Sequence, residues 1–170
     1  MIIPDAPPFI QFMPSHLVVI IISLFLFIYI PYQINKHRKA SWIETISKSL
    51  GILLIGNEMG WVIYKLILGH TNWAEFMPFE LCTINAYVLG ILLIYRPSYS
   101  IFEVIYFWAM GGTVQGIITP RLFAGFPHYL FFEYFITHTG IILAVLVLIF
   151  RYNWKVTWLS LWRYLLWLQV

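Results

Sequence analysis

The sequence predicts an all-α protein: a polytopic transmembrane helix bundle of five or six spans, forming one domain over residues 1–170. Two observations predict this fold class. Hydrophobic residues make up 61% of the chain and charged residues only 10%, whereas soluble domains have roughly 25% charged residues. The hydrophobic residues also occur in long blocks, and a helix needs ~20 such residues, with ~17 as a lower limit, to cross a bilayer.

Six hydrophobic segments are the predicted spans. They cover residues 16–32, 49–68, 79–95, 99–119, 129–150 and 156–170. The first five are long enough to cross a membrane. The sixth stops at Val170, which predicts that the chain is a truncated version of a longer protein. The segment before the first span, Met1–Pro14, has no basic residues and several prolines, so it is not a signal peptide and is expected to be irregular.

Basic residues between the spans predict the orientation. Those in alternate loops are Lys36, His37, Arg38, Lys39, Arg96, Arg151 and Lys155. Because cytoplasmic loops are enriched in lysine and arginine, these loops are predicted to be cytoplasmic and the N-terminus outside. The net charge of +3 is explained by these flanking residues, so nucleic acid is not predicted as a partner.

Polar residues gather in the outer halves of the predicted spans. They include His16, Glu58, Lys65, Glu80, Cys82, Gln115, Thr119, His128, Glu133 and His138. Ionisable side chains inside a membrane usually face a protein interior or water. Their uneven distribution therefore predicts a polar cavity that faces outward. Within it, Cys82 shares a helix face with Asn85, and His138 shares one with Tyr134, because residues three or four apart lie on one face.

Cys82 is the candidate nucleophile. As the single cysteine of the chain, it excludes an intramolecular disulfide and a multi-cysteine zinc site. A catalytic thiol needs a base, which His138 or His128 can supply. The alternative is that Cys82 packs as a small apolar residue, that His138 joins helices by hydrogen bonding, and that His128 and His16 simply face the interface or water.

Glu58 is expected to have a partner, because an isolated carboxylate inside a membrane must be paired or protonated. The predicted partner is His138, at a similar depth. Such a pair can orient the imidazole, as a triad acid does, or it can be a structural ion pair. The histidines and carboxylates also permit a metal site, but no two histidines have close helical spacing. Neither a metal nor a cofactor is therefore predicted.

Three segments resemble the YwaF-like integral membrane proteins of bacteria. They are Phe107-Trp-Ala-Met-Gly-Gly-Thr-Val-Gln-Gly116 with Ile118-Thr-Pro120, Phe126-Pro-His-Tyr-Leu-Phe-Phe132 with Ile136-Thr-His138, and Pro78-Phe-Glu-Leu-Cys82. The last is similar to the family's Pro-x-His-x-Cys element, with Glu80 where the histidine is expected. The resemblance covers roughly residues 58–148 and implies an integral protein of the bacterial plasma membrane.

The resemblance also implies a function, because members of the transmembrane-protein-164 type are described as cysteine-dependent acyltransferases that remodel ether phospholipids. It implies that Cys82 accepts an acyl group from a membrane phospholipid and that His138 or His128 is the base. Glu58 would orient that histidine, and Gln115 would donate a hydrogen bond to the oxyanion. Glu80 departs from the family pattern and disfavours a nearby thiolate.

Two other functions remain open from the sequence. One is a transporter or binding protein for a small molecule or ion, which would use the same polar cluster. Discontinuous helices would favour it, and the hints of these are Gly111-Gly112 and Pro120. Gly112 and Gly116 also form a Gly-xxx-Gly pair, which permits close helix contact. The other is a non-functional truncated fragment.

Overall fold

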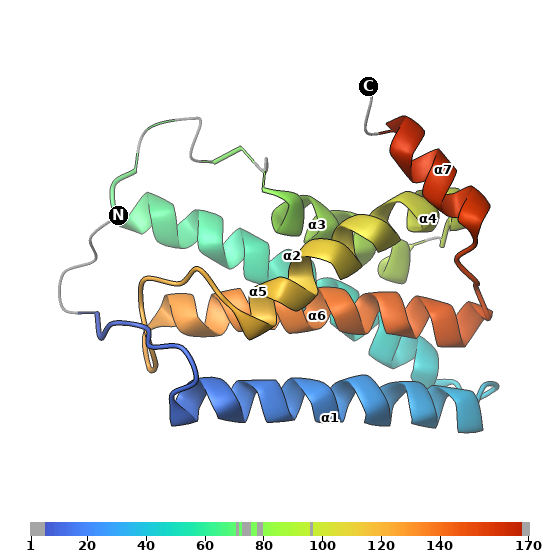
Figure 1. The fold of residues 1–170 in the computed structure, drawn as a ribbon, viewed down its shortest axis with the longest axis horizontal. Helices are drawn as coiled ribbons and strands as arrows, with labels where there is room; N and C mark the ends of the chain where they lie inside the picture. Colours follow the sequence, from blue (N-terminus) through green and yellow to red (C-terminus); the bar gives the residue numbers. More distant parts are fainter. Residues whose placement is uncertain (1–5, 71, 73–75, 78–79, 96, 168–170) are drawn as a thin grey trace.

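The computed structural model describes residues 6–70, 72, 76–77, 80–95 and 97–167. Figure 1 shows them as a bundle of helices. In chain order these are α1 (Pro14–Lys36), α2 (Trp42–Ile67), α3 (Leu81–Ile94), α4 (Tyr99–Trp108), the π turn η2 (Ala109–Thr113), α5 (Val114–Ile118), α6 (Tyr129–Tyr152) and α7 (Trp158–Trp167). Within the described residues, four helical segments are long and apolar enough to cross a membrane, one of them being α4, η2 and α5 together. The prediction of an all-α membrane bundle is confirmed.

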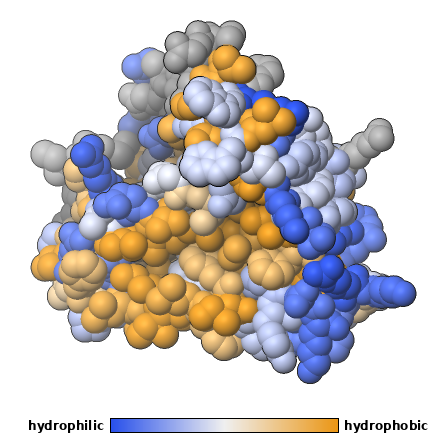
Figure 2. Space-filling view, turned by 45° about the vertical axis from the view of Figure 1, so that its right-hand side comes forward, coloured by the Kyte–Doolittle hydropathy of each residue, from blue (hydrophilic) through white to orange (hydrophobic). Residues whose placement is uncertain are grey.

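Helix α6 lies at the centre of the bundle. It packs against α1, α2, α3, η2 and α5, and its residues Ile141, Ala144, Val145, Val147 and Leu148 belong to the buried core. The outer helix α1 instead exposes large apolar side chains, as a helix in contact with lipid does. Figure 2 shows a broad hydrophobic surface with hydrophilic residues at its margins. Hydropathy alone predicted that both helices are membrane spans. Only the burial of their side chains distinguishes the central helix α6 from the peripheral helix α1.

Helices α2 and α3 approach each other closely at two glycines. A Cβ atom added to Gly51 would lie 2.7 Å from the backbone oxygen of Gly90, and one added to Gly90 would lie 2.7 Å from Cγ1 of Ile55. Small residues permit such contacts between membrane helices. This contact holds the second half of α3, the helix that carries Cys82, against α2.

Two predicted segments differ from the helices at their ends. The second segment was expected over residues 49–68, but α2 begins at Trp42. Its first turns contain polar residues, including the ion pair between Lys48 and Glu44 at 2.7 Å, so hydropathy did not detect them. The sixth segment was expected over residues 156–170. It contains the ten-residue helix α7, and residues 168–170 lie outside the described part of the chain, as do Pro78 and Phe79 before α3.

Helix α7 is joined to α4 by a buried carboxylate. Glu103 accepts hydrogen bonds from the Ser160 hydroxyl and, at 2.7 Å, from Nη1 of Arg163. Glu103 itself is buried, whereas the Arg163 side chain is half exposed. A buried charge must be paired, so these contacts account for the position of this short helix.

Replacing Arg163 with glutamine is expected to loosen α7 without unfolding the bundle. A hydrogen bond to a charged group contributes ~1.5–3 kcal/mol, and less when it is partly exposed. Hydrogen exchange of the backbone amides in residues 158–167 should therefore accelerate, while exchange in α6 should not change. Unchanged exchange in α7 would show that Glu103 does not anchor this helix.

The N-terminal segment packs against the loop before α6. Pro8 and Ala124 form an antiparallel bridge, and the amide of Gly125 donates to the carbonyl oxygen of Pro7 at 2.6 Å. Directly after this segment, His16 is fully buried, with Nε2 donating to the Ile117 carbonyl at 2.9 Å. The interpretation of His16 as a water-facing residue is therefore wrong. Its ring joins α1 to the end of α5.

Candidate active site

Cys82 lies in the first turn of α3 and is half buried. The helix begins at Leu81, after Glu80 in extended conformation, so Cys82 is its second residue. The thiol is free and packs against the edge of the core. The side chain of Thr113, at the end of the π turn, lies beside the thiol. A half-buried thiol in this position needs a neighbouring base to act as a nucleophile.

His138 lies in the middle of α6 and is held in a defined orientation. Its Nδ1 donates to the carbonyl oxygen of Tyr134 at 2.7 Å, because a carbonyl can only accept. In the neutral ring, Nε2 therefore carries the lone pair. The imidazole stacks on the Tyr134 ring at a centroid distance of 3.9 Å, and the Tyr134 hydroxyl donates to the Gly116 carbonyl at 3.1 Å. The histidine is thus prepared to accept a proton at Nε2.

The imidazole and the thiol contact the same helical segment at adjacent turns. A Cβ atom added to Gly116 would lie 2.8 Å from Nε2 of His138, while Thr113 lies beside Cys82. Thr113 and Gly116 are three residues apart, which corresponds to ~5 Å along the helix. In the described part of the chain no hydrogen bond joins Cys82 to His138. The structure therefore brings the two into one region without direct contact.

His128 has a structural role at the start of α6. It is the N-cap residue of this helix, and its Nδ1 accepts a hydrogen bond from the amide of Leu130 at 3.2 Å. Its Nε2 lies 3.5 Å from the Tyr64 hydroxyl. Nδ1 therefore caps α6 and Nε2 joins it to the end of α2, which favours the structural interpretation of this histidine.

Gln115 is exposed and forms a contact within its own segment. Its Nε2 donates to the hydroxyl of Thr119 at 2.5 Å, and that hydroxyl in turn donates to the Gln115 carbonyl. This geometry does not bring the amide to Cys82. The expectation that Gln115 donates to an oxyanion at the thiol is therefore not supported by the arrangement of the side chains.

Glu58 is buried but does not pair with His138. Its carboxylate accepts a hydrogen bond from the Thr137 hydroxyl at 2.9 Å, and the side chain of Thr83 on α3 lies beside it. Asn57 donates both to Thr137 at 2.9 Å and to the Glu133 carbonyl at 2.9 Å. The predicted Glu58–His138 pair is thus replaced by a network of hydroxyl and amide groups. This network joins α2 to α6 beside the first turn of α3, which carries Cys82.

The described residues contain no group of three or more histidine, cysteine, aspartate or glutamate side chains that could hold a metal ion. The arrangement is instead that of a thiol, an oriented imidazole and several neutral hydrogen-bonding groups. Such a set can support acyl transfer through a covalent intermediate.

Three residues of this region had no assigned role from the sequence. Tyr134 orients the imidazole, and Thr113 and Asn85 are fully buried polar residues on the elements that border Cys82. The spacing that puts Asn85 near Cys82 and Tyr134 near His138 was visible in the sequence. The position of Thr113 was not, because a π turn joins residues five apart and changes which side chains face α3.

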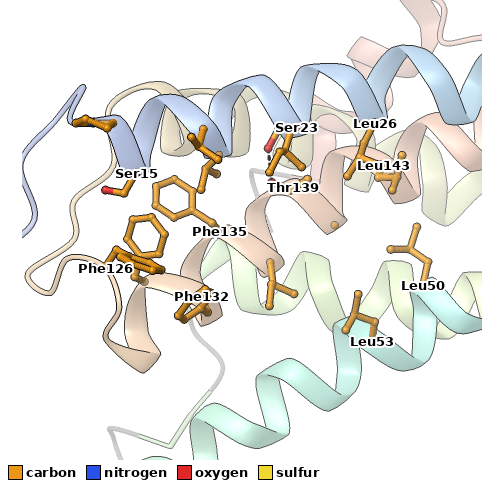
Figure 3. A pocket seen from close by; sticks show the side chains of 17 residues that line it. Ser15, Ser23, Leu26, Leu50, Leu53, Phe126, Phe132, Phe135, Thr139 and Leu143 are labelled. Carbon is orange, nitrogen blue, oxygen red and sulfur yellow. Dashed lines mark hydrogen bonds between the residues drawn. The ribbon is translucent and has the colours of Figure 1, made fainter.

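A separate cavity of about 730 Å³ lies on the other side of α6. It is bounded by α1, α2 and α6, and its lining is almost entirely apolar. Figure 3 shows Phe126, Phe132 and Phe135 at one end and, bordering the cavity, the hydrogen bond between Ser23 and Thr139, which measures 2.8 Å. None of the predicted site residues lines it. Along α1 it extends from Pro14 to Leu26, ~18 Å at 1.5 Å per residue.

Comparison with known proteins shows the family of this chain. No curated protein and no solved structure shows significant similarity to it. A family model does match: that of the TMEM164 family, over residues 9–170. This match includes α1 to α7 and every candidate site residue, and it confirms the resemblance inferred from the three motifs. The chain is an integral membrane protein that belongs to the TMEM164 family.

Proposed function

We propose that this protein is a membrane-embedded acyltransferase that moves an acyl group from a phospholipid through a thioester on Cys82. The orientation of His138 is the observation that carries the proposal. Its Nδ1 is bound to the Tyr134 carbonyl, so Nε2 is the free basic atom, and it faces Gly116, one turn from the residue beside Cys82. The proposed reaction requires a movement that brings the thiol and this nitrogen together.

The proposed reaction has two steps. As His138 Nε2 takes the thiol proton, the sulfur of Cys82 attacks the ester carbonyl carbon of the donor lipid. The oxyanion then collapses, the ester C–O bond breaks, and the imidazolium returns its proton to the departing lyso-lipid oxygen. In the second step the hydroxyl of another lyso-lipid gives its proton to His138 and attacks the thioester carbonyl; the C–S bond breaks, and the thiolate takes the proton back from the imidazolium. The two steps are therefore balanced without a metal or redox cofactor.

We also propose that the site opens to the outer leaflet of the bacterial plasma membrane. The loop cations Arg38, Lys39, Arg151 and Lys155 lie at the end of the bundle where α1 and α6 finish. Helix α3 runs back toward this end, so Cys82, its second residue, lies on the far side of that helix, level with Glu58 in the middle of α2. By the positive-inside rule the cationic end is cytoplasmic, so donor lipids reach the thiol from the outer side.

Trapping of the thioester tests the function. Purified protein in nanodiscs with a phospholipid that carries a labelled acyl chain is expected to acquire a covalent label that neutral hydroxylamine removes. Cys82→Ala should abolish it, and His138→Gln should slow its formation by ~10²–10⁴-fold, the usual contribution of a general base. An undiminished yield in Cys82→Ala or Cys82→Ser would refute the proposal.

A proton-coupled transporter is the second candidate, and the buried Glu58 favours it. This carboxylate lies in the middle of α2 and is bonded to the Thr137 hydroxyl, with the Thr83 side chain beside it, a setting typical of proton-carrying sites in membranes. In liposomes that contain a pH-sensitive dye, Glu58→Gln would stop proton flux and Cys82→Ala would not. For the acyltransferase we expect instead that Cys82→Ala abolishes covalent labelling and that the protein carries no proton flux for Glu58→Gln to stop.

A further inference from the structure

Buried polar atoms without hydrogen-bond partners occur on the two elements that border Cys82. Among the described residues they are Nδ2 and Oδ1 of Asn85, Oγ1 of Thr113 and Nε1 of Trp108. All three residues belong to α3 or to the segment α4–η2, and these elements pack against each other. Buried polar groups are nearly always hydrogen-bonded, so an unpaired group requires an explanation.

The helix geometry directs these groups toward the thiol. Asn85 lies one turn after Cys82 on the same face of α3, and helical side chains lean toward the N-terminus of their helix. Asn85 and Thr113 are both fully buried. The Thr113 hydroxyl lies beside the thiol but has no hydrogen-bond partner. The two residues thus border Cys82 from two helices, with unused donors.

We propose that the Asn85 amide and the Thr113 hydroxyl form the oxyanion hole for acyl transfer at Cys82; this inference rests on the proposed function. When the sulfur attacks the ester, the C–S bond forms and the carbonyl π electrons move to oxygen. Nδ2 of Asn85 and Oγ1 of Thr113 then donate to that oxygen. On collapse the electrons return, and the alkoxide leaves with a proton from His138.

Unpaired donors suit this role because they bind the transition state more strongly than the resting state. A donor that already bonds to the protein would have to break that bond first, whereas these two have no such bond to break. Gln115, the donor expected from the sequence, is engaged with Thr119. The π turn contributes by placing Thr113 on the face toward α3, and such turns are frequent at functional sites.

Two reactions of Cys82 test the inference. One is acylation by 4-nitrophenyl octanoate, measured from the burst of nitrophenolate and the mass of the adduct. The other is alkylation by iodoacetamide, which displaces iodide and forms no oxyanion. Asn85→Leu and Thr113→Val are each expected to slow acylation by ~10²-fold, as loss of one oxyanion donor does, and to leave alkylation unchanged. Thr113→Ser, which keeps the hydroxyl, should restore acylation.

The control is Thr139→Val, which removes a hydroxyl on the opposite side of α6 and should change neither reaction. Equal losses of acylation and alkylation in Asn85→Leu and Thr113→Val, or a lowered thermal midpoint, would assign these residues a structural role and overturn the inference. Acylation at the wild-type rate in both variants would overturn this inference but not the proposed function. A wild-type protein that forms no adduct on Cys82 would overturn the proposed function as well.

Discussion

Replacing Gly116 with alanine is expected to slow acylation of Cys82 by roughly 10²-fold in a bundle that remains folded, because a displacement of ~1 Å in a reacting group can have this effect. The new Cβ atom would lie 2.5 Å from Cδ2 and 2.8 Å from Nε2 of His138. The imidazole must therefore move, although its Nδ1 is bound to the Tyr134 carbonyl and its ring is stacked on Tyr134. The burst of nitrophenolate from 4-nitrophenyl octanoate measures this rate.

Gly112→Ala is the matched control for this substitution. It makes the same chemical change one turn earlier, where a Cβ atom meets nothing within 4 Å. Acylation and iodoacetamide alkylation should both remain at the wild-type rate. The Gly-xxx-Gly pair thus divides into one glycine required by contact with His138 and one that faces open space. Equal rates in Gly116→Ala and Gly112→Ala would show that the position of His138 does not limit the reaction.

Replacing Gly51 with alanine is expected to lower the free energy of unfolding by ~1–3 kcal/mol, the usual effect of overpacking a core. The added Cβ atom would lie 2.7 Å from the Gly90 backbone oxygen and 2.8 Å from Cγ1 of Ile94. A backbone atom cannot move aside as a side-chain end can, so α2 and α3 must separate. Thermal or SDS denaturation of protein in detergent micelles measures the loss.

Gly56→Ala on the same helix is the matched control for Gly51→Ala. A Cβ atom at Gly56 meets nothing within 4 Å, and alanine is favoured over glycine inside a helix by ~0.5–1 kcal/mol. This variant should therefore be as stable as the wild type or slightly more stable. If Gly51→Ala were equally stable, the close approach of α2 and α3 would not contribute to stability.

The helices could be predicted from the sequence where hydropathy alone determines them. The fifth segment, predicted over residues 129–150, agrees closely with α6 (Tyr129–Tyr152). The start of α2 was missed because a helix can extend beyond the membrane into residues that are polar, and hydropathy does not detect hydrogen bonding or ion pairs. The α7 segment was predicted as a span, but its ten described helical residues are fixed by a buried carboxylate on another helix.

The candidate site could be predicted only in part. The sequence identified Cys82 and His138 by residue type and depth, and spacing connected them to Asn85 and Tyr134. It did not identify the partner of Glu58, because Thr137 and His138 are consecutive on α6 and both lie at the same depth. Side-chain direction separates them: Thr137 donates to Glu58, whereas His138 turns toward Gly116.

By itself the sequence determined that this protein is an all-α membrane bundle and which residues carry reactive groups, since length, hydropathy and residue type are local properties. Only the tertiary structure decided that His16 is buried, that His128 caps a helix, and that Thr113 borders Cys82. These outcomes depend on contacts between residues far apart in the chain. The physical reason is that a polar group inside a membrane takes whichever partner the packing of the helices brings within reach.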